Sequence, residues 1–147
     1  MFNKSLKILN FNAYRAFDIK KIMRFNDMLK IYHPSIVTIQ EIHVQNALRV
    51  FQGEYKVIVN IEQSSREQIG ICMLVQKNIK VNDIIIGQNG RIIGVLLDSI
   101  RVFNLYPKSG TQNRNQREIF FREELPHLLK FWDNTKTEAI FCGELYP

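Results

Sequence analysis

The pattern of hydrophobic and polar positions divides the chain into short strands and a few amphipathic helices. Leu6 to Asn12 alternates with a period of two, which indicates a first strand. Apolar residues then recur at helical spacing from a cap at Asp18 to about Tyr32, and Pro34 ends that helix. Ile36 to Ile39 is an apolar run typical of a buried strand. This strand–helix–strand order predicts two parallel strands.

The middle of the chain predicts mainly antiparallel strands. A short helix over Val44–Phe51 comes first, and a hairpin turns around Asp98-Ser99. Because hairpins dominate this region, it argues against a plain doubly wound parallel sheet. The expected strands are Tyr55–Ile61, Gly70–Gln76, Ile79–Ile86, Arg91–Leu97 and Ile100–Tyr106.

The last third predicts one long helix and one strand. Asn113 or Asn115 is a suitable cap for a helix that runs to about Trp132, and Pro126 inside it predicts a kink. Glu138–Cys142 reads as the last strand. With 147 residues and no repeat or linker, the chain is expected to form a single domain, a layered α/β sandwich with mixed sheets.

Composition narrows the class of protein. Lys and Arg exceed Asp and Glu by 20 to 14, a net charge of +6 that favours polyanionic partners such as nucleic acid. No apolar run reaches the roughly 18 residues that span a bilayer, and the start has no secretory signal. Cys72 and Cys142 lie in strand-like runs without a CxxC spacing, so we expect buried, reduced thiols. These features favour an intracellular protein, nuclear or cytoplasmic, without a membrane partner.

Polar side chains collect at the ends of four predicted strands. If these ends converge, they form a pocket of carboxylates, amides and phenols, which are the oxygen ligands that Mg²⁺ prefers and that phosphodiester hydrolysis uses. Each signal has an ordinary alternative, since a Glu after a strand often begins a helix, Asn favours turns and Tyr lies at core edges. The polar residues at the four strand ends are, in chain order, Asn10 and Asn12, Gln40 and Glu41, Asn104 and Tyr106, and Glu144 and Tyr146.

Several blocks, in the same order, resemble a known family. They are similar to the motifs of the endonuclease domain of non-LTR (LINE-type) retrotransposons, within the endonuclease/exonuclease/phosphatase superfamily. The "Q-E-x-H" block is the most specific of them. The matching blocks are Ile8–Arg15 (similar to "LNINGLR"), His33–His43 (similar to "P-D-I-V-x-x-Q-E-T-H"), Asn104–Thr111 (similar to "N-x-Y-A-P-S-G-T"), Asn113–Phe121 and Cys142–Tyr146 (in the place of "G-D-F-N").

The resemblance implies a four-layer α/β/β/α sandwich and a role for each matching residue. Glu41 would be the main ligand of Mg²⁺ or Mn²⁺, and Asn10 would support the metal and the catalytic network. Tyr106 would contact the scissile phosphate of DNA. Glu144 would orient or activate the attacking water, and Tyr146 would help to hold the phosphate.

Basic residues near these blocks are candidates for contacts with the DNA backbone. Arg15 follows the first strand, and Lys108, Arg114 and Arg117 follow Tyr106. Such residues supply affinity for phosphates rather than sequence reading. The ordinary alternative is a solvated face.

The chain also departs from the family pattern. Glu144 stands in place of Asp, Tyr146 in place of Asn and Ala13 in place of Gly. The family's second half, with a further Asp block and a terminal catalytic His, does not follow Pro147. We therefore expect the amino-terminal part of such a domain, weak or inactive by itself, whose partners include a missing carboxy-terminal half or a reverse transcriptase region. A non-catalytic DNA-binding remnant and a phosphatase of the same superfamily are the alternatives.

Overall fold

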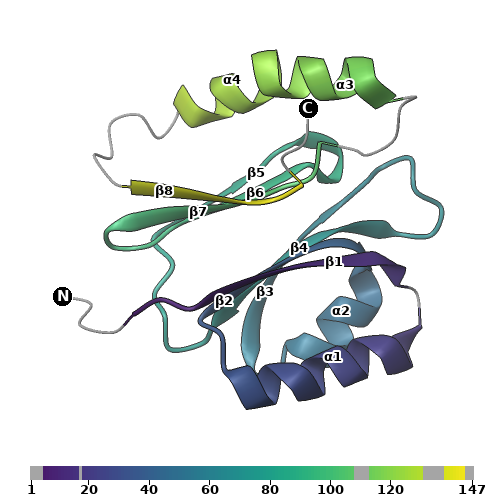
Figure 1. Cartoon of the computed structure of the whole chain (residues 1–147), viewed down its shortest axis with the longest axis vertical. Coiled ribbons are helices and arrows are strands. Elements are labelled where there is room, and N and C mark those ends of the chain that lie inside the picture. The colour runs from purple at the N-terminus through teal and green to yellow at the C-terminus, as the bar shows by residue number, and fades with distance from the viewer. Residues whose placement is uncertain (1–4, 17, 108–112, 131–137, 145–147) are drawn as a thin grey trace.

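Two four-stranded sheets face each other, and helices cover both outer faces (Figure 1). This computed structural model describes residues 5–16, 18–107, 113–130 and 138–144. Helices α1 (Ile19–Tyr32) and α2 (Val44–Phe51) cover the first sheet. Helices α3 (Arg114–Ile119) and α4 (Leu125–Lys130) cover the second. The layers therefore run α/β/β/α, as the sequence predicts.

The first sheet has the strand order β1-β2-β4-β3. β1 pairs with β2 in parallel, which confirms the predicted strand–helix–strand unit, and β4 runs antiparallel to both of its neighbours. β1 is longer than the alternation indicates, because a register shift between Asn12 and Ala16 lets it continue past the regular pattern. The bounds are β1 Ile8–Ala16, β2 Ile36–His43, β3 Tyr55–Ile61 and β4 Ile69–Gln76.

Capping interactions define the ends of the two helices that cover this sheet. The Asp18 carboxylate accepts from the backbone N–H of Lys20 at 2.8 Å, and His33 ends α1 in a left-handed conformation (φ 47°). His43 caps α2 through its ring Nδ1, which accepts from the backbone N–H of Asn46 at 3.2 Å. His43 thus has a structural role at the join of β2 and α2.

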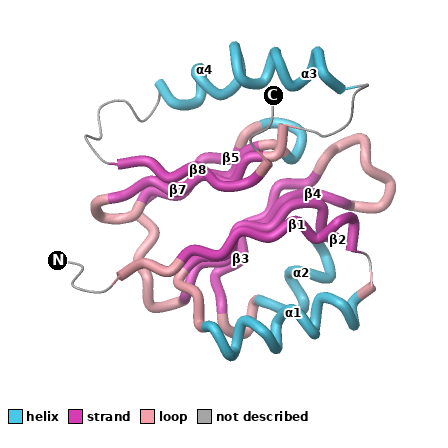
Figure 2. Tube along the Cα trace, viewed as in Figure 1, coloured by secondary structure: helices cyan, strands magenta, loops and turns pink. Residues whose placement is uncertain are grey.

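The second sheet has the order β5-β6-β7-β8, with β7 and β8 parallel. Figure 2 shows this sheet between the first sheet and helices α3 and α4. The predicted strand Ile79–Ile86 is shorter in the structure and starts at Asp83. Ile79 instead closes a turn on Gln76 and is buried between the sheets, so its burial does not require strand pairing. The bounds are β5 Asp83–Ile86, β6 Ile92–Leu96, β7 Ile100–Leu105 and β8 Glu138–Gly143.

The helix over the second sheet is interrupted where the sequence predicts a kink. A π-helical turn, Phe120–Glu124, joins α3 to α4, with the backbone N–H of Leu125 donating to the Phe120 carbonyl. Pro126 has no N–H for the carbonyl four residues before it and would crowd that carbonyl in a regular α-helix, so the wider turn relieves the conflict. Asn113 occupies the N-cap position but makes no side-chain cap bond, Asn115 lies inside α3, and Trp132 lies outside the described residues.

Between the sheets lies an apolar core that holds them face to face. It includes Ile36, Met73, Ile93, Val95 and Val102, all fully buried. Cys72 is buried and Cys142 half-buried, both as free thiols, and burial raises the pKa of each. None of the helices in the described part of the chain is long and apolar enough to cross a membrane.

Candidate active site

The carboxyl ends of β1, β2, β7 and β8 meet at one end of the sandwich. β1 and β2 are parallel in one sheet and β7 and β8 are parallel in the other, so each pair ends on the same side. Both β1 and β2 contact β8 across the sheets. The strand-end polar residues singled out in the sequence are therefore brought together, except for Tyr146, which lies outside the described residues.

A buried amide network links the two sheets just below this end. The Gln40 amide Nε2 donates to the Oδ1 atoms of both Asn10 and Asn104, each at 2.8 Å. Asn104 in turn donates to two backbone carbonyls of the first sheet, at 2.9 and 3.1 Å. Thr38 Oγ1 also donates to Asn10 Oδ1 at 2.8 Å. Because Gln40 and Asn104 are fully buried, the network fixes how the strand ends face each other.

Glu41 and Tyr106 form the first of two contacts between site residues of different sheets. Glu41 has a left-handed backbone (φ 54°), and the pairing of β2 with β4 shifts register between Ile39 and Ile42. Such a backbone is costly for a non-glycine residue, and it re-aims the side chain of a strand residue. The Tyr106 hydroxyl donates to Glu41 Oε1 at 2.5 Å, and its backbone N–H is anchored on the Arg91 carbonyl at 2.8 Å.

Asn12 and Glu144 form the second contact. The Asn12 amide Nδ2 donates to Glu144 Oε1. Glu144 follows Gly143, whose left-handed backbone (φ 116°) lies so close to β7 that an added Cβ would be 1.9 Å from the Leu105 carbonyl oxygen. The backbone N–H of Glu144 donates to that same carbonyl at 3.2 Å. The end of β8 is thereby held against β7, and the carboxylate points to the first sheet.

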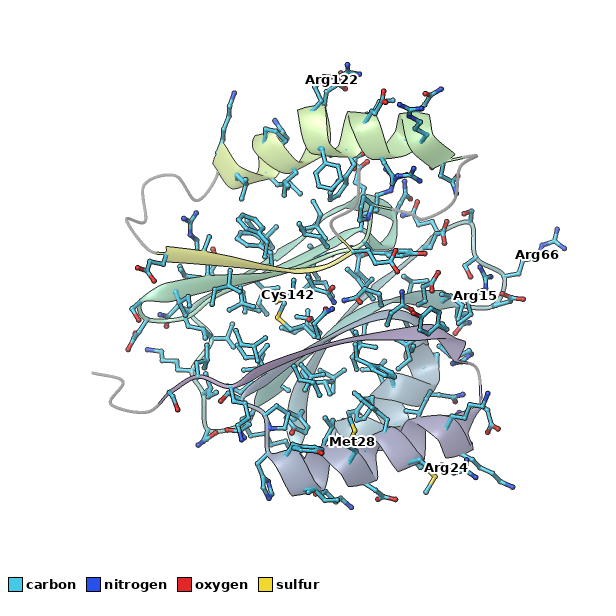
Figure 3. The ribbon with its side chains drawn as sticks, viewed as in Figure 1. Arg15, Arg24, Met28, Arg66, Arg122 and Cys142 are labelled. Carbon is cyan, nitrogen blue, oxygen red and sulfur yellow. The ribbon has the colours of Figure 1, made fainter. Side chains whose placement is uncertain are left out.

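Arg15 brings positive charge to the same end of the molecule (Figure 3). Its guanidinium pairs with Glu67 at 2.7 Å, and both side chains are more than half exposed. The hydrogen bond to Glu67 raises the Arg15 pKa most, and the charges of Glu41 and Tyr106 raise it further. Arg15 therefore lies within electrostatic range of the Glu41–Tyr106 pair.

The other residues predicted for the site take no part in these two contacts. Asn10 lies in the amide network, where its Oδ1 already accepts two hydrogen bonds. Arg114 and Arg117 lie on α3, over the outer face of the second sheet, and Arg114 pairs with Glu118 at 3.5 Å. Lys108 lies outside the described residues. A DNA contact by any of these cations stays a prediction.

Sequence reasoning missed three members of this arrangement as site residues. The sequence marks Asn12 as a strand-end amide without assigning it a role, although Asn12 lies on the same face of β1 as Asn10. Gln40 and Asn104 were noticed in the same way, and the structure places them in the network that joins the sheets. The detectable signal was a polar residue at a position where a buried strand favours an apolar one.

The donor chemistry of the site fits a hard divalent cation. Glu41 and Glu144 supply carboxylate oxygens and Asn12 an amide, whereas no soft ligand takes part in these contacts. Within the described ranges, no group of three or more His, Cys, Asp or Glu side chains is arranged to hold a metal. The residues thus suit Mg²⁺, which keeps several waters and takes one or two carboxylates together with substrate phosphate oxygens.

Solved structures share this architecture. An AP endonuclease from Archaeoglobus fulgidus superposes with a TM-score of 0.68 at 22% identity, over 95% of this chain and 56% of that one. Truncated Caenorhabditis elegans TDP2 gives 0.68 at 20% identity, over 95% and 61%. A 3′ phosphatase, NExo from Neisseria, bound to a product DNA hairpin, gives 0.68 at 16% identity, over 95% and 57%. This chain has the endonuclease/exonuclease/phosphatase fold.

The likeness rests on structure alone. No family model and no curated protein matches the sequence. The chain spans 56 to 61% of the length of these three solved proteins. The predicted link to retrotransposons finds no counterpart among them.

Proposed function

We propose that this chain carries part of the active site of a Mg²⁺-dependent phosphodiesterase that cuts DNA, and that its own turnover is weak. The observation that supports this most directly is the pair of carboxylate contacts, Glu41 with Tyr106 and Asn12 with Glu144, at the end where four strands meet. The solved proteins of the same fold include an AP endonuclease and a DNA-bound 3′ phosphatase. A net charge of +6 suits a phosphate backbone as substrate.

Each residue has a distinct part in this proposal. Glu41 and Glu144 would hold the cation, which when bound polarises a phosphoryl oxygen and lowers the pKa of water. The Tyr106 hydroxyl, which donates to Glu41 in the structure, would instead donate to a non-bridging phosphate oxygen of the substrate. Glu144, oriented by the Asn12 amide, accepts a hydrogen bond from the attacking water. Arg15 offsets the charge of the phosphate.

Weak turnover follows from the departures noted in the sequence. Glu144 is one methylene longer than the Asp of the family it resembles, and a misplacement of about 1 Å costs roughly 100-fold in rate. Tyr146 likewise stands where the family has Asn, and this replaces an amide donor and acceptor with a phenol. The finer assignment to a retrotransposon endonuclease rests on the sequence blocks, above all Asn113–Phe121.

Nicking of supercoiled plasmid tests the proposal. Wild-type protein in excess, with Mg²⁺, should convert plasmid slowly to the open circular form, and EDTA should stop it. Glu41→Gln should lower the rate by roughly 100-fold or more, because it removes the main cation ligand. Glu54→Gln, a matched change of an exposed carboxylate in the turn before β3, should leave the rate unchanged.

The alternatives give different results in the same assay series. Protein that is folded by circular dichroism and shows no Glu41-dependent nicking would overturn the hydrolase and favour a DNA-binding remnant, whose affinity should fall steeply with salt. Release of phosphate from a 3′-phosphorylated oligonucleotide, without nicking, would favour a phosphatase. One solved protein of this fold is such a 3′ phosphatase.

A further inference from the structure

Near its end, β1 contains two consecutive left-handed residues beside the candidate site. Tyr14 has φ 48° and Arg15 has φ 60°, within the register shift that separates Asn12 from Ala16 in the pairing with β2. Ala13, which stands where the family pattern has Gly, is not one of the left-handed residues. Left-handed backbone costs free energy for residues that carry a Cβ, and the surrounding structure must hold it in place.

Neighbouring side chains hold this turn at both of its positions. Asn12 Oδ1 accepts from the backbone N–H of Tyr14 at 2.8 Å, while the Nδ2 of the same side chain donates to Glu144. Arg15 is held by its 2.7 Å ion pair with Glu67. The conformation of Tyr14 is therefore tied through a single amide to one of the two site carboxylates.

The result is an aromatic side chain that projects into solvent at the site. Tyr14 is 82% exposed, more than any other large apolar side chain in the described part of the chain. A single exposed aromatic residue needs no explanation in itself, and Tyr32, 58% exposed at the far end of α1, is such a case. Tyr14 differs because strained backbone, anchored on a site residue, presents it.

The neighbouring charge fits a nucleotide. Arg15 is adjacent to Tyr14, and the Asn12 side chain that accepts from the Tyr14 N–H also donates to Glu144, so the turn lies beside the candidate site. A cation next to an exposed aromatic face is the arrangement with which proteins hold single-stranded nucleic acid, the cation on the backbone and the ring under a base.

We propose that Tyr14 is a stacking platform for an unpaired base next to the phosphate that Glu41 and Tyr106 would hold, and that the substrate is therefore DNA with a single-stranded or unpaired nucleotide at the cut. This rests on the proposed function and names its substrate class. Stacking on an aromatic ring tolerates any base and favours one that need not leave a duplex. The platform thus selects for DNA structure and not for sequence.

Binding in EDTA tests the platform without turnover. Fluorescence anisotropy would measure the affinity for a single-stranded oligonucleotide and for the matching blunt duplex, with wild type, Tyr14→Ala, Tyr14→Phe and Tyr32→Ala. Tyr14→Ala should weaken single-strand binding about 10-fold, as loss of one base–aromatic stack does. Tyr14→Phe should restore it, Tyr32→Ala should match wild type, and the duplex affinity should change less than about 2-fold.

A second readout locates the base. An oligonucleotide with 2-aminopurine at one position should lose fluorescence on binding wild type and Tyr14→Phe, but not Tyr14→Ala. Equal losses of affinity for single strand and duplex, or a Tyr14→Phe variant as weak as Tyr14→Ala, would overturn the platform.

The nicking assay distinguishes failure of the platform from failure of the proposed function. If Glu41-dependent nicking persists and Tyr14→Ala changes no affinity, the platform alone fails. If Tyr14-dependent stacking occurs and nicking does not, the hydrolase alone fails.

Discussion

At the scale of single residues, the two sheets are joined by side chains that a buried strand does not normally contain. Gln40 and Asn104 are fully buried; the Gln40 amide nitrogen donates to the Asn104 Oδ1, and the Asn104 amide nitrogen donates to two backbone carbonyls. Gln40 directly precedes Glu41, and Asn104 lies two residues before Tyr106. Stability and site geometry therefore depend on the same few hydrogen bonds.

Removal of the Asn104 side chain should destabilise the protein. Asn104→Ala leaves the carbonyls of Ile39 and Cys72 and one Gln40 hydrogen without a partner, which should lower the free energy of unfolding by roughly 2–3 kcal/mol. Urea unfolding followed by circular dichroism would measure it. The control is Asn82→Ala, which removes only a 3.4 Å exposed contact with Asp98. Equal stability of the two variants would show that the network contributes nothing.

The cysteines should differ in reactivity. Burial raises the pKa of both thiols, and Cys72 is fully buried whereas Cys142 is half-buried and also hydrogen-bonded to Thr38. Iodoacetamide at pH 8 should label Cys142 slowly and Cys72 only in urea. Rapid labelling of Cys72 in the native state would contradict its burial.

The raised thiol pKa values also predict how stability depends on pH. An unfolded thiol loses its proton near its ordinary pKa of about 8.5, whereas the buried thiols of the folded state keep theirs to higher pH. This contribution to the free energy of unfolding should therefore be complete below that pH and should fall as the pH rises beyond it.

At the scale of elements, the turn that ends β8 positions a site carboxylate. Gly143→Ala would place a Cβ 1.9 Å from the Leu105 carbonyl oxygen, on a backbone with φ 116°. We expect a loss of roughly 2–4 kcal/mol of unfolding free energy. Displacement of Glu144 should also lower any nicking by roughly 100-fold. Gly53→Ala, where an added Cβ meets nothing within 4 Å, is the control, and it should change neither quantity.

The helix over the second sheet offers a test of the π-helical turn. Pro126→Ala restores a backbone N–H to an exposed position. The full cost of proline in a helix is about 3 kcal/mol, but the wider turn already absorbs the clash, so we expect stabilisation of about 1 kcal/mol. Urea unfolding would measure it against Arg122→Ala, an exposed change in the same helix (Figure 3). A loss of stability would show that the turn does not arise from the proline.

At the scale of the whole molecule, both sheets expose a strand on the same flank. In the described part of the chain β1 and β8 each pair with one strand only, and both carry an aromatic side chain more than a third exposed, Phe11 and Phe141. The solved proteins of this fold are longer than this chain, which spans 56 to 61% of three of them. Unpaired edges of this kind favour association.

Self-association should therefore increase with salt. The net charge of +6 repels copies of the chain, and salt screens that repulsion while the exposed edges remain. Sedimentation at rising protein concentration should show a larger mean mass at 0.5 M than at 0.05 M NaCl. A monomer at every concentration in both salts would show that these edges are protected.

Local pattern was enough to predict most elements. The bounds of the Val44–Phe51 helix and the Tyr55–Ile61 strand agree with the structure, because caps, turns and apolar period are all encoded by neighbouring residues. The strand predicted from Ile79 failed because apolar side chains are also buried in a turn between the sheets. Period alone does not distinguish these two kinds of burial.

The sequence by itself determined most of the elements, the parallel β1–β2 pair and the strand-end positions where polar side chains collect, and its family resemblance indicated the four layers. Only the tertiary structure decided which of those side chains meet. Asn12 and Glu144 are 132 residues apart, and Glu41 and Tyr106 are 65 apart. Their contacts depend on left-handed backbone at Glu41 and Gly143 and on how the two sheets face each other. Side-chain direction at a bulge and packing between layers are set by non-local contacts, which no local pattern records.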